Sequence, residues 1–230
     1  MPGTATTPVA YTTLASATSH ELEIKRSRFI AYLFRTETEE EARSALAGLR
    51  KRHHDARHHC SAFVIGPDRG IQRSNDDGEP SGTAGAPMLE AISKRQAPHG
   101  GTDLSDITAV VVRYFGGILL GAGGLVRAYS EAVSTALDGA PLIVRQRMAL
   151  FGIDADHAGA GRLENELRAA GTTVLGTDYG PKLATLRIAL PDGPDAAAAF
   201  AGRLATLTAG RATAVHTGSE WVDLEPGKAP

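Results

Sequence analysis

The sequence contains little cysteine, few aromatic residues and no long apolar run. Among its 230 residues, one is cysteine and 5% are aromatic. A single thiol excludes an internal disulfide framework and fits a reducing, cytoplasmic environment. No apolar stretch approaches the roughly 18 to 20 residues needed to cross a bilayer, so we expect no membrane partner.

The sequence also lacks a large excess of either positive or negative charge. The formal net charge is −2, from 24 basic and 26 acidic residues, so no overall basic field points to nucleic acid. The first residues are rich in Thr, Ala and Ser and lack the basic and apolar regions of a signal peptide. We therefore predict a flexible N-terminus over residues 1–18.

The first half of the chain predicts a mixed α/β domain, residues 19–142. Alternating apolar residues predict one or two strands over 20–35, and Thr38 with Glu41 forms a capping box that begins a helix. A strand at 59–66, a turn and a strand at 71–75 form a hairpin. A short helix begins at Pro87, the strand 106–115 is covered on both faces, and a helix follows over 125–138.

The second half has a different rhythm and predicts a ferredoxin-like α+β domain, residues 145–224. Strand patterns at 148–155, 172–180, 183–191 and 211–224 alternate with helix patterns at 157–171 and 194–210. This βαββαβ order is the split-βαβ arrangement. The fold class is therefore α/β and α+β in two domains, with a boundary within residues 142–147.

The stretch "RSNDDGEPSGTAGAP", residues 73–87, is almost free of apolar side chains. Asp76, Asp77 and Glu79 have the chemistry of general acids, general bases or ligands of a hard cation such as Mg²⁺. A turn at Asp77 with Ser81 or Thr83 as helix caps explains the loop equally, and taken alone it is the favoured interpretation.

A second polar stretch joins the strand 106–115 to the following helix. It contains Arg113, Tyr114 and Arg127, with glycines at positions 116, 117, 121, 123 and 124. Glycines allow close backbone approach, and the free N–H groups of a helix N-terminus attract an anion. Close helix–sheet packing is the alternative. The spacing matches neither a Rossmann motif nor a P-loop, so it is weak evidence for a nucleotide.

For two further clusters, we favour a structural role over a functional one. "HHDARHHC", residues 53–60, lacks the spacing of a zinc site, so we expect no metal there. His58 and Cys60 lie on one side of a strand, and we expect both to be structural rather than a nucleophile pair. Lys25, Arg26 and Arg28 form a basic strand that could contact phosphates, although a solvated face explains it as well.

The blocks "KRSRFIA", "HHCSAFVIG", "SNDDGEPSGTAGAPMLEAI" and "DITAVVVRYFGGILLGAGGLVRAYSEAV" together resemble the YigZ/IMPACT family over residues 20–140. Residues 145–222 are similar to the C-terminal domain of its bacterial members by pattern. The resemblance implies an N-terminal fold like domain IV of elongation factor G, a ribosomal small-subunit protein and the GHMP kinases. It also implies a ferredoxin-like C-terminal domain.

The family resemblance implies a regulator of translation. Eukaryotic members bind an activator of an initiation-factor kinase, and nucleic-acid or ribosome binding is proposed for bacterial members. Ala86 and Leu119 depart from the family pattern, because basic residues are common at both positions. If those positions contact phosphate, part of that contact is lost here.

We therefore predict a non-catalytic binding protein whose acidic loop and glycine-rich turn form one site for RNA, the ribosome or another phosphate-bearing ligand. Arg113, Arg127 and the helix N-terminus would hold the phosphate. No cofactor is expected, apart from a Mg²⁺ ion that could bridge the carboxylates. The alternatives are a protein–protein regulator of a translation-stress pathway and an enzyme acting on phosphorylated small molecules.

Overall fold

The computed structural model describes residues 9–97 and 100–224, and this part of the chain forms two compact units. Unit 1 ends at Val144, and unit 2 comprises Arg145–Leu224. Both contain helices and strands, so the predicted two-domain α/β and α+β class is confirmed. None of the helices in the described ranges is long and apolar enough to cross a membrane.

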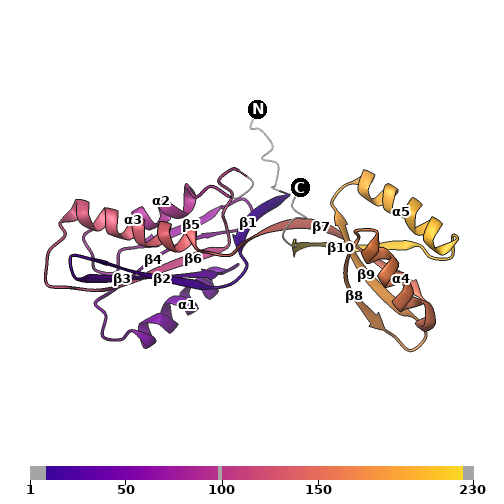
Figure 1. Cartoon of the computed structure of the whole chain (residues 1–230), viewed down its shortest axis with the longest axis horizontal. Coiled ribbons are helices and arrows are strands. Elements are labelled where there is room, and N and C mark those ends of the chain that lie inside the picture. The colour runs from indigo at the N-terminus through magenta and orange to yellow at the C-terminus, as the bar shows by residue number, and fades with distance from the viewer. Residues whose placement is uncertain (1–8, 98–99, 225–230) are drawn as a thin grey trace. The chain divides into compact units, whose positions relative to one another are not determined.

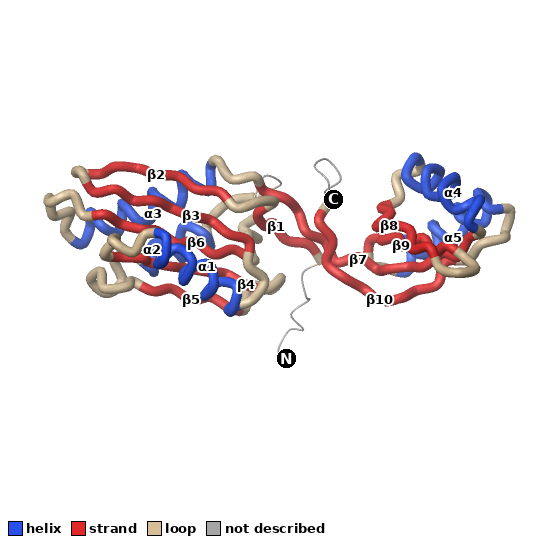
Figure 2. The backbone as a smooth tube through the Cα atoms, turned by 90° about the horizontal axis from the view of Figure 1, so that it is seen from below, coloured by secondary structure: helices blue, strands red, loops and turns tan. Residues whose placement is uncertain are grey.

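Unit 1 is built on a five-stranded sheet in the order β2-β3-β6-β4-β5, in which every pair is antiparallel. Figure 2 shows these strands side by side. Their bounds are β2 (Thr18–Ile24), β3 (Ser27–Arg35), β4 (His58–Ile65), β5 (Ile71–Asn75) and β6 (Ile107–Tyr114). The predicted strands over 20–35 are thus a hairpin of two, and the predicted hairpin before residue 75 is present.

Helices cover both faces of this sheet (Figure 1). They are α1 (Glu39–Arg52) on one face, and α2 (Gly85–Ser93) and α3 (Ala122–Asp138) on the other. On one face, Leu49 of α1 packs with Val110 and Val112. On the other face, Val111 packs with Met88 of α2 and Tyr129 of α3. The central strand β6 is therefore buried on both sides, as its run of valines predicts.

The local sequence predicted the start of α1 correctly but not the start of α2. The capping box of Thr38 and Glu41 is formed at the start of α1. Helix α2 instead begins at Gly85, two residues before Pro87, and Ala84 at its N-cap supplies no side-chain hydrogen bond. Ser81 and Thr83 therefore do not cap α2, because the carboxylate of Asp76, earlier in the same loop, accepts from the backbone N–H groups of Ala84 and Gly85.

The prediction of a flexible N-terminus over residues 1–18 is wrong for part of that range. Strand β1 (Ala10–Leu14) has four buried residues, pairs with β7 and is followed closely by β2. The burial of Tyr11 and Leu14 stabilises this strand. The sequence does not reveal it, because the segment is rich in Thr and shows little apolar periodicity. Residues 1–8 lie outside the described part of the chain.

Unit 2 has the predicted βαββαβ order. Its elements are β7 (Leu142–Ala155), α4 (His157–Ala169), β8 (Thr173–Tyr179), β9 (Ala184–Pro191), α5 (Pro194–Thr208) and β10 (Ala214–Asp223). The antiparallel sheet order β10-β7-β9-β8 is that of the split-βαβ fold. Strand β7 starts at Leu142, so the region of the predicted boundary, residues 142–147, is strand, and the division between the units falls between Val144 and Arg145.

Unit 2 has its own apolar core, which includes Ile153, Leu163, Ile188 and Phe200. We expect residues 145–230 expressed alone to unfold in one cooperative transition, because domains of this size can bury enough apolar surface for marginal stability. Urea unfolding followed by circular dichroism checks this. A gradual, non-cooperative change would show that unit 2 is no independent domain.

Candidate functional site

The acidic loop and the glycine-rich turn meet at one pocket of about 340 Å³ in unit 1. We call it the Arg113 pocket. It is lined by side chains of β4, the loop after β5, the end of β6 and the start of α3. The residues that line it include Arg57, His58, Glu79, Arg113, Phe115, Leu119, Gly121 and Ala122.

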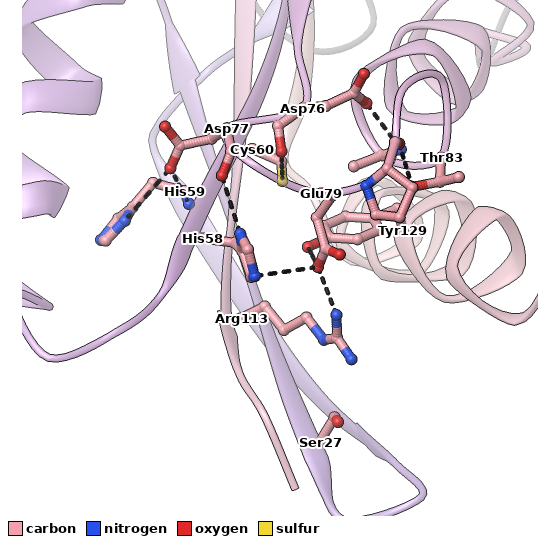
Figure 3. A network of polar contacts seen from close by, with 12 residues as sticks. Ser27, His58, His59, Cys60, Asp76, Asp77, Glu79, Thr83, Arg113 and Tyr129 are labelled. Atoms are coloured by element: carbon pink, nitrogen blue, oxygen red, sulfur yellow. Dashed lines mark hydrogen bonds and ion pairs between the residues drawn. The ribbon is translucent and has the colours of Figure 1, made fainter. Parts of the chain in front are cut away.

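A buried ion pair forms one wall of the pocket (Figure 3). Arg113 Nη1 donates to Glu79 Oε1 at 2.5 Å, and the Tyr129 hydroxyl donates to the same oxygen at 2.7 Å. Burial raises the pKa of Tyr129, which keeps this hydroxyl protonated as a donor. The guanidinium lies over the rings of Phe29 and Phe115, at 5.3 and 5.6 Å from their centroids. Arg113 is thereby fixed in place.

Asp76 organises the acidic loop rather than facing the pocket. Its carboxylate accepts hydrogen bonds from the backbone N–H groups of Gly82, Ala84 and Gly85, at 2.7 to 3.0 Å. Burial would raise the pKa of Asp76, but these three donors outweigh it and lower the pKa below its usual value. Asp76 therefore caps the start of α2 from a distance in sequence.

Asp77 points the opposite way (Figure 3). Its carboxylate pairs with Arg50 Nη2 of α1 at 2.6 Å and accepts from the His59 backbone N–H at 2.7 Å. Asp77 adopts a positive φ of 43°, so it is a turn residue, as the alternative interpretation of the loop as a turn predicts. Of the three acids expected to face the glycine-rich turn, only Glu79 lines the pocket.

The carboxylates therefore do not converge on one cation. No group of three or more His, Cys, Asp or Glu side chains suited to a metal ion occurs in the described ranges. Each acid has a different partner: backbone N–H groups for Asp76, Arg50 for Asp77 and Arg113 for Glu79. This geometry gives no support to Mg²⁺ bridging.

His58 and Cys60 lie below the acidic loop on β4. His58 Nδ1 is 2.9 Å from the Asp77 carbonyl oxygen, and its Nε2 is 4.0 Å from Glu79 Oε1. Cys60 is fully buried, and its Sγ donates to the Asp76 carbonyl oxygen at 3.0 Å. Burial raises the pKa of the Cys60 thiol to about 12, so the reactive thiolate is scarce at neutral pH. The buried Cys60 side chain therefore holds the acidic loop in place through its hydrogen bond to the Asp76 backbone.

The glycines of the second stretch serve different purposes. A Cβ at Gly116 would lie 2.0 Å from the Arg26 carbonyl carbon, so the backbones touch there. Gly117 and Gly121 have φ values of 82° and 74°. Gly123 and Gly124 are inside α3, and Gly123 has no positive φ and no atom within 4 Å of a Cβ placed there, so neither its dihedrals nor its surroundings require glycine.

The N-terminus of α3 is open. Its N-cap residue, Gly121, makes no side-chain hydrogen bond, and the first turn of the helix carries no acid. Gly121 and Ala122 both line the Arg113 pocket. Unsatisfied N–H groups and the positive end of the helix dipole therefore border the pocket, as the sequence predicts for an anion site.

The basic strand prediction is only partly right. Lys25 and Arg26 have φ values of 49° and 63° and form the two-residue turn of the β2–β3 hairpin, not strand. Both are exposed, and the Arg26 backbone touches Gly116. Arg28 is in β3, where it pairs with Glu21 at 2.7 and 3.0 Å.

Tyr114 and two loop residues lie apart from the pocket. Because side chains alternate along β6, Tyr114 faces α1, where its hydroxyl donates to Asp55 Oδ1 and contacts His53 Nδ1, both at 3.0 Å. Ser81 is exposed, and Thr83 donates to the Pro80 carbonyl oxygen. None of the three lines the Arg113 pocket.

Sequence reasoning missed Arg57, Phe115 and Tyr129 as site residues. Tyr129 lies on the apolar face of α3, and a tyrosine predicted there signals a buried partner for its hydroxyl. Phe115 is 42% exposed although it follows a buried strand, so exposure singles it out only in the structure. Arg57 precedes β4 with no distinguishing local pattern.

Comparisons with known proteins match both units. Residues 25–137 match the Impact N-terminal domain, and residues 153–211 match a domain of unknown function, DUF1949. IMPACT family member YvyE of Bacillus subtilis is 49% identical over 159 residues, covering 69% of this chain and 70% of that protein. IMPACT family member YigZ of Escherichia coli is 40% identical over 190 residues, covering 82% and 88%.

A solved structure described as "Crystal structure of an hypothetical protein" is also similar to this chain. It has a TM-score of 0.59 and 34% sequence identity, and the match covers 95% of this chain and 99% of that one. The similarity therefore extends through both units.

Proposed function

The chain belongs to the IMPACT family, and from this premise we propose that it is a non-catalytic, cytoplasmic regulator of translation that binds RNA through unit 1 without a cofactor. The RNA phosphates would lie at the open N-terminus of α3, beside the glycine-rich turn.

A group of unpaired cations around that turn carries the proposal. Lys25, Arg26, Arg57 and Arg127 are exposed, and none has an ion pair within the described residues. Arg26 touches Gly116, Arg57 lines the pocket, and Arg127 is on α3. Exposed cations of this kind supply most of the sequence-independent affinity for a phosphate backbone.

The acidic loop does not oppose an RNA backbone. Arg50 offsets the charge of Asp77, Arg113 offsets that of Glu79, and three N–H groups hold Asp76. Of the charged residues that line the pocket, Glu79 and Arg113 pair with each other, which leaves the exposed Arg57, although the net charge of the chain is −2. This local balance is what a single-strand phosphate track requires.

Replacing Arg57 or Arg127 by alanine is expected to weaken binding of a single-stranded RNA several-fold, whatever its sequence. Each change should also lower the slope of log affinity against log salt by about 0.7, since one phosphate contact is lost. Fluorescence anisotropy at several salt concentrations measures both effects.

Lys51 provides the matched control. It is an exposed cation without an ion pair in the described ranges, and it lies on α1, which covers the other face of the sheet. Lys51→Ala should leave both affinity and slope unchanged. If all three variants bind RNA as the parent does, or if the parent binds none at low salt, the RNA proposal is wrong.

A protein partner is a second candidate, favoured by exposed apolar residues on the same turn. Phe115, Ile118 and Leu119 are 42%, 40% and 82% exposed. Neighbouring apolar side chains of this size are more typical of an interaction site than of an inert surface. A pull-down with and without ribonuclease separates the candidates. Capture that survives ribonuclease and is lost in Leu119→Ser supports the protein partner.

A further inference from the structure

The guanidinium of Arg113 uses one of its nitrogen atoms in a hydrogen bond within the described residues. Nη1 donates to Glu79 Oε1 at 2.5 Å, and Figure 3 shows another nitrogen of the group pointing away from this carboxylate. Nε is buried without a partner, and Nη2 donates no hydrogen bond to the described part of the chain. Arg113 is only 5% exposed, so the Nε–Nη2 edge of a buried cation is left without an acceptor.

This edge of an arginine binds paired oxygens. Arg28 shows the geometry on the surface of the same unit, where its Nε and Nη2 donate to the two carboxylate oxygens of Glu21 at 2.7 and 3.0 Å. Two parallel N–H groups fit two oxygens of a carboxylate or of a phosphate. Buried donors are rarely left unsatisfied, so the free edge of Arg113 indicates an oxyanion ligand.

The start of α3 brings further donors to the same pocket. The first hydrogen bond of this helix joins the Leu125 N–H to the Gly121 carbonyl oxygen, so the three N–H groups before Leu125 have no partner within the helix. Gly121 and Ala122 line the pocket together with Arg113. The helix N-terminus and the buried guanidinium edge therefore favour the same kind of ligand from two elements.

The negative charge of Glu79 is already offset. Its Oε1 accepts from Arg113 and from the Tyr129 hydroxyl, at 2.5 and 2.7 Å. His58 Nε2 lies 4.0 Å from the same oxygen and forms an ion pair with it whenever His58 is protonated. The exposed Arg57 also lines the pocket and adds a positive charge. The local charge thus favours an anion over a cation.

The size of the pocket favours an oxyanion at the end of a strand. Its volume of about 340 Å³ is at the lower end for ligand pockets. An internal phosphodiester carries a nucleoside on each side, and both would have to follow it toward the buried arginine, whereas a terminal phosphate can enter first and alone. A terminal phosphate also carries about −1.5 to −2 charges at neutral pH and three acceptor oxygens, which is more than a diester offers.

We propose that the Arg113 pocket binds the terminal phosphate of an RNA strand, so that the protein recognises RNA ends. This inference rests on the RNA binding proposed above. Arg113 would hold phosphate oxygens through its Nε–Nη2 edge, and the N–H groups at the start of α3 would hold another. The exposed cations around the glycine-rich turn would contact the internal phosphates that follow.

The test compares uridine oligonucleotides of one length that carry a phosphate at the 5′ end, at the 3′ end or at neither end. The full-length protein is expected to bind a phosphate-ended strand about tenfold more tightly than the hydroxyl-ended strand, because charge-assisted hydrogen bonds are lost with the phosphate. A preference for a phosphate at one end or at both supports the proposal. Fluorescence anisotropy measures the affinities.

A strand of matched charge controls for general electrostatic attraction. A hydroxyl-ended strand that is about two nucleotides longer carries as much charge as the phosphate-ended strand. It should still bind several-fold more weakly. If it binds as tightly as the phosphate-ended strand, the preference reflects total charge, and the proposal is overturned.

Two variants locate the preference. Ala122→Glu places a carboxylate in the pocket at the first turn of α3, where an acid favours the helix, so we expect the fold to be retained. This variant should bind phosphate-ended and hydroxyl-ended strands equally. Ala47→Glu is the matched control, because Ala47 is an exposed alanine of α1, on the other face of the sheet. It should keep the full preference. A full preference in Ala122→Glu, or its loss in Ala47→Glu, argues against the pocket and overturns the proposal.

The outcomes also separate this inference from the proposed function. Equal affinity for all strands overturns the terminal phosphate and leaves RNA binding intact. Absence of binding to every strand overturns both. Uridine monophosphate provides the last comparison, since it has the same phosphate without a strand. If it binds as tightly as the phosphate-ended oligonucleotide, the pocket is assigned to a free phosphate ester and the recognition of RNA ends is overturned.

Discussion

Replacing Gly116 by alanine is expected to lower the free energy of unfolding of unit 1 by about 3 kcal/mol, the upper range for an overpacked site. The new Cβ would lie 2.0 Å from the Arg26 carbonyl carbon, 2.1 Å from its oxygen and 2.4 Å from the Ser27 nitrogen. These are backbone atoms of a tight turn, so they cannot move aside as a flexible side chain would. Urea unfolding monitored by circular dichroism measures the loss.

Gly123 is the matched control for Gly116. It lies in the same glycine-rich stretch, but it is in the first turn of α3, and a Cβ there meets nothing within 4 Å. Gly123→Ala should be neutral or should stabilise unit 1 by up to about 1 kcal/mol, because alanine is the better helix former. If both alanine variants are equally stable, the close approach at Gly116 is not a constraint on the fold.

Replacing Arg113 by alanine is expected to destabilise unit 1 by about 3 to 5 kcal/mol, since Glu79 would keep a buried charge without its cation. Both side chains are almost fully buried, at 7% and 4% exposure. Denaturant unfolding of Arg113→Ala against the parent measures this effect. The cooperative transition of unit 2 serves as an internal reference.

Two further variants isolate the cause. Arg28→Ala also breaks an arginine–glutamate pair, but that pair is exposed, so its effect should be far smaller. The double change Glu79→Leu with Arg113→Met removes both charges at similar volume and should recover much of the stability. If the double variant is as unstable as Arg113→Ala, packing rather than the unpaired charge explains the loss.

The stability prediction also decides how binding can be tested. A weaker interaction of Arg113→Ala with RNA would not distinguish a lost phosphate contact from a damaged pocket, because Arg113 holds Glu79 in place. The exposed cations Arg57 and Arg127 have no such structural partner within the described residues. They are the appropriate positions for measuring phosphate contacts, whereas Arg113 reports on the integrity of the site.

Local sequence predicted the elements whose formation depends on neighbours in the chain. The Thr38–Glu41 capping box, the β4–β5 hairpin and the βαββαβ order of unit 2 are all present. The valine run of β6 likewise indicated burial on both faces. These features follow from hydrogen bonding within a turn and from apolar periodicity, which are visible in a single sequence.

The sequence by itself thus determined the two domains, most of their elements and the two stretches that form the pocket. Only the tertiary structure decided that Asp76, Asp77 and Glu79 point to three different partners, and that Gly116 rather than Gly123 needs to be glycine. The reason is that the partners Arg50, Arg113 and Arg26 lie on other segments of the chain. Secondary-structure propensity and residue spacing do not show which of several adjacent side chains a distant segment will contact.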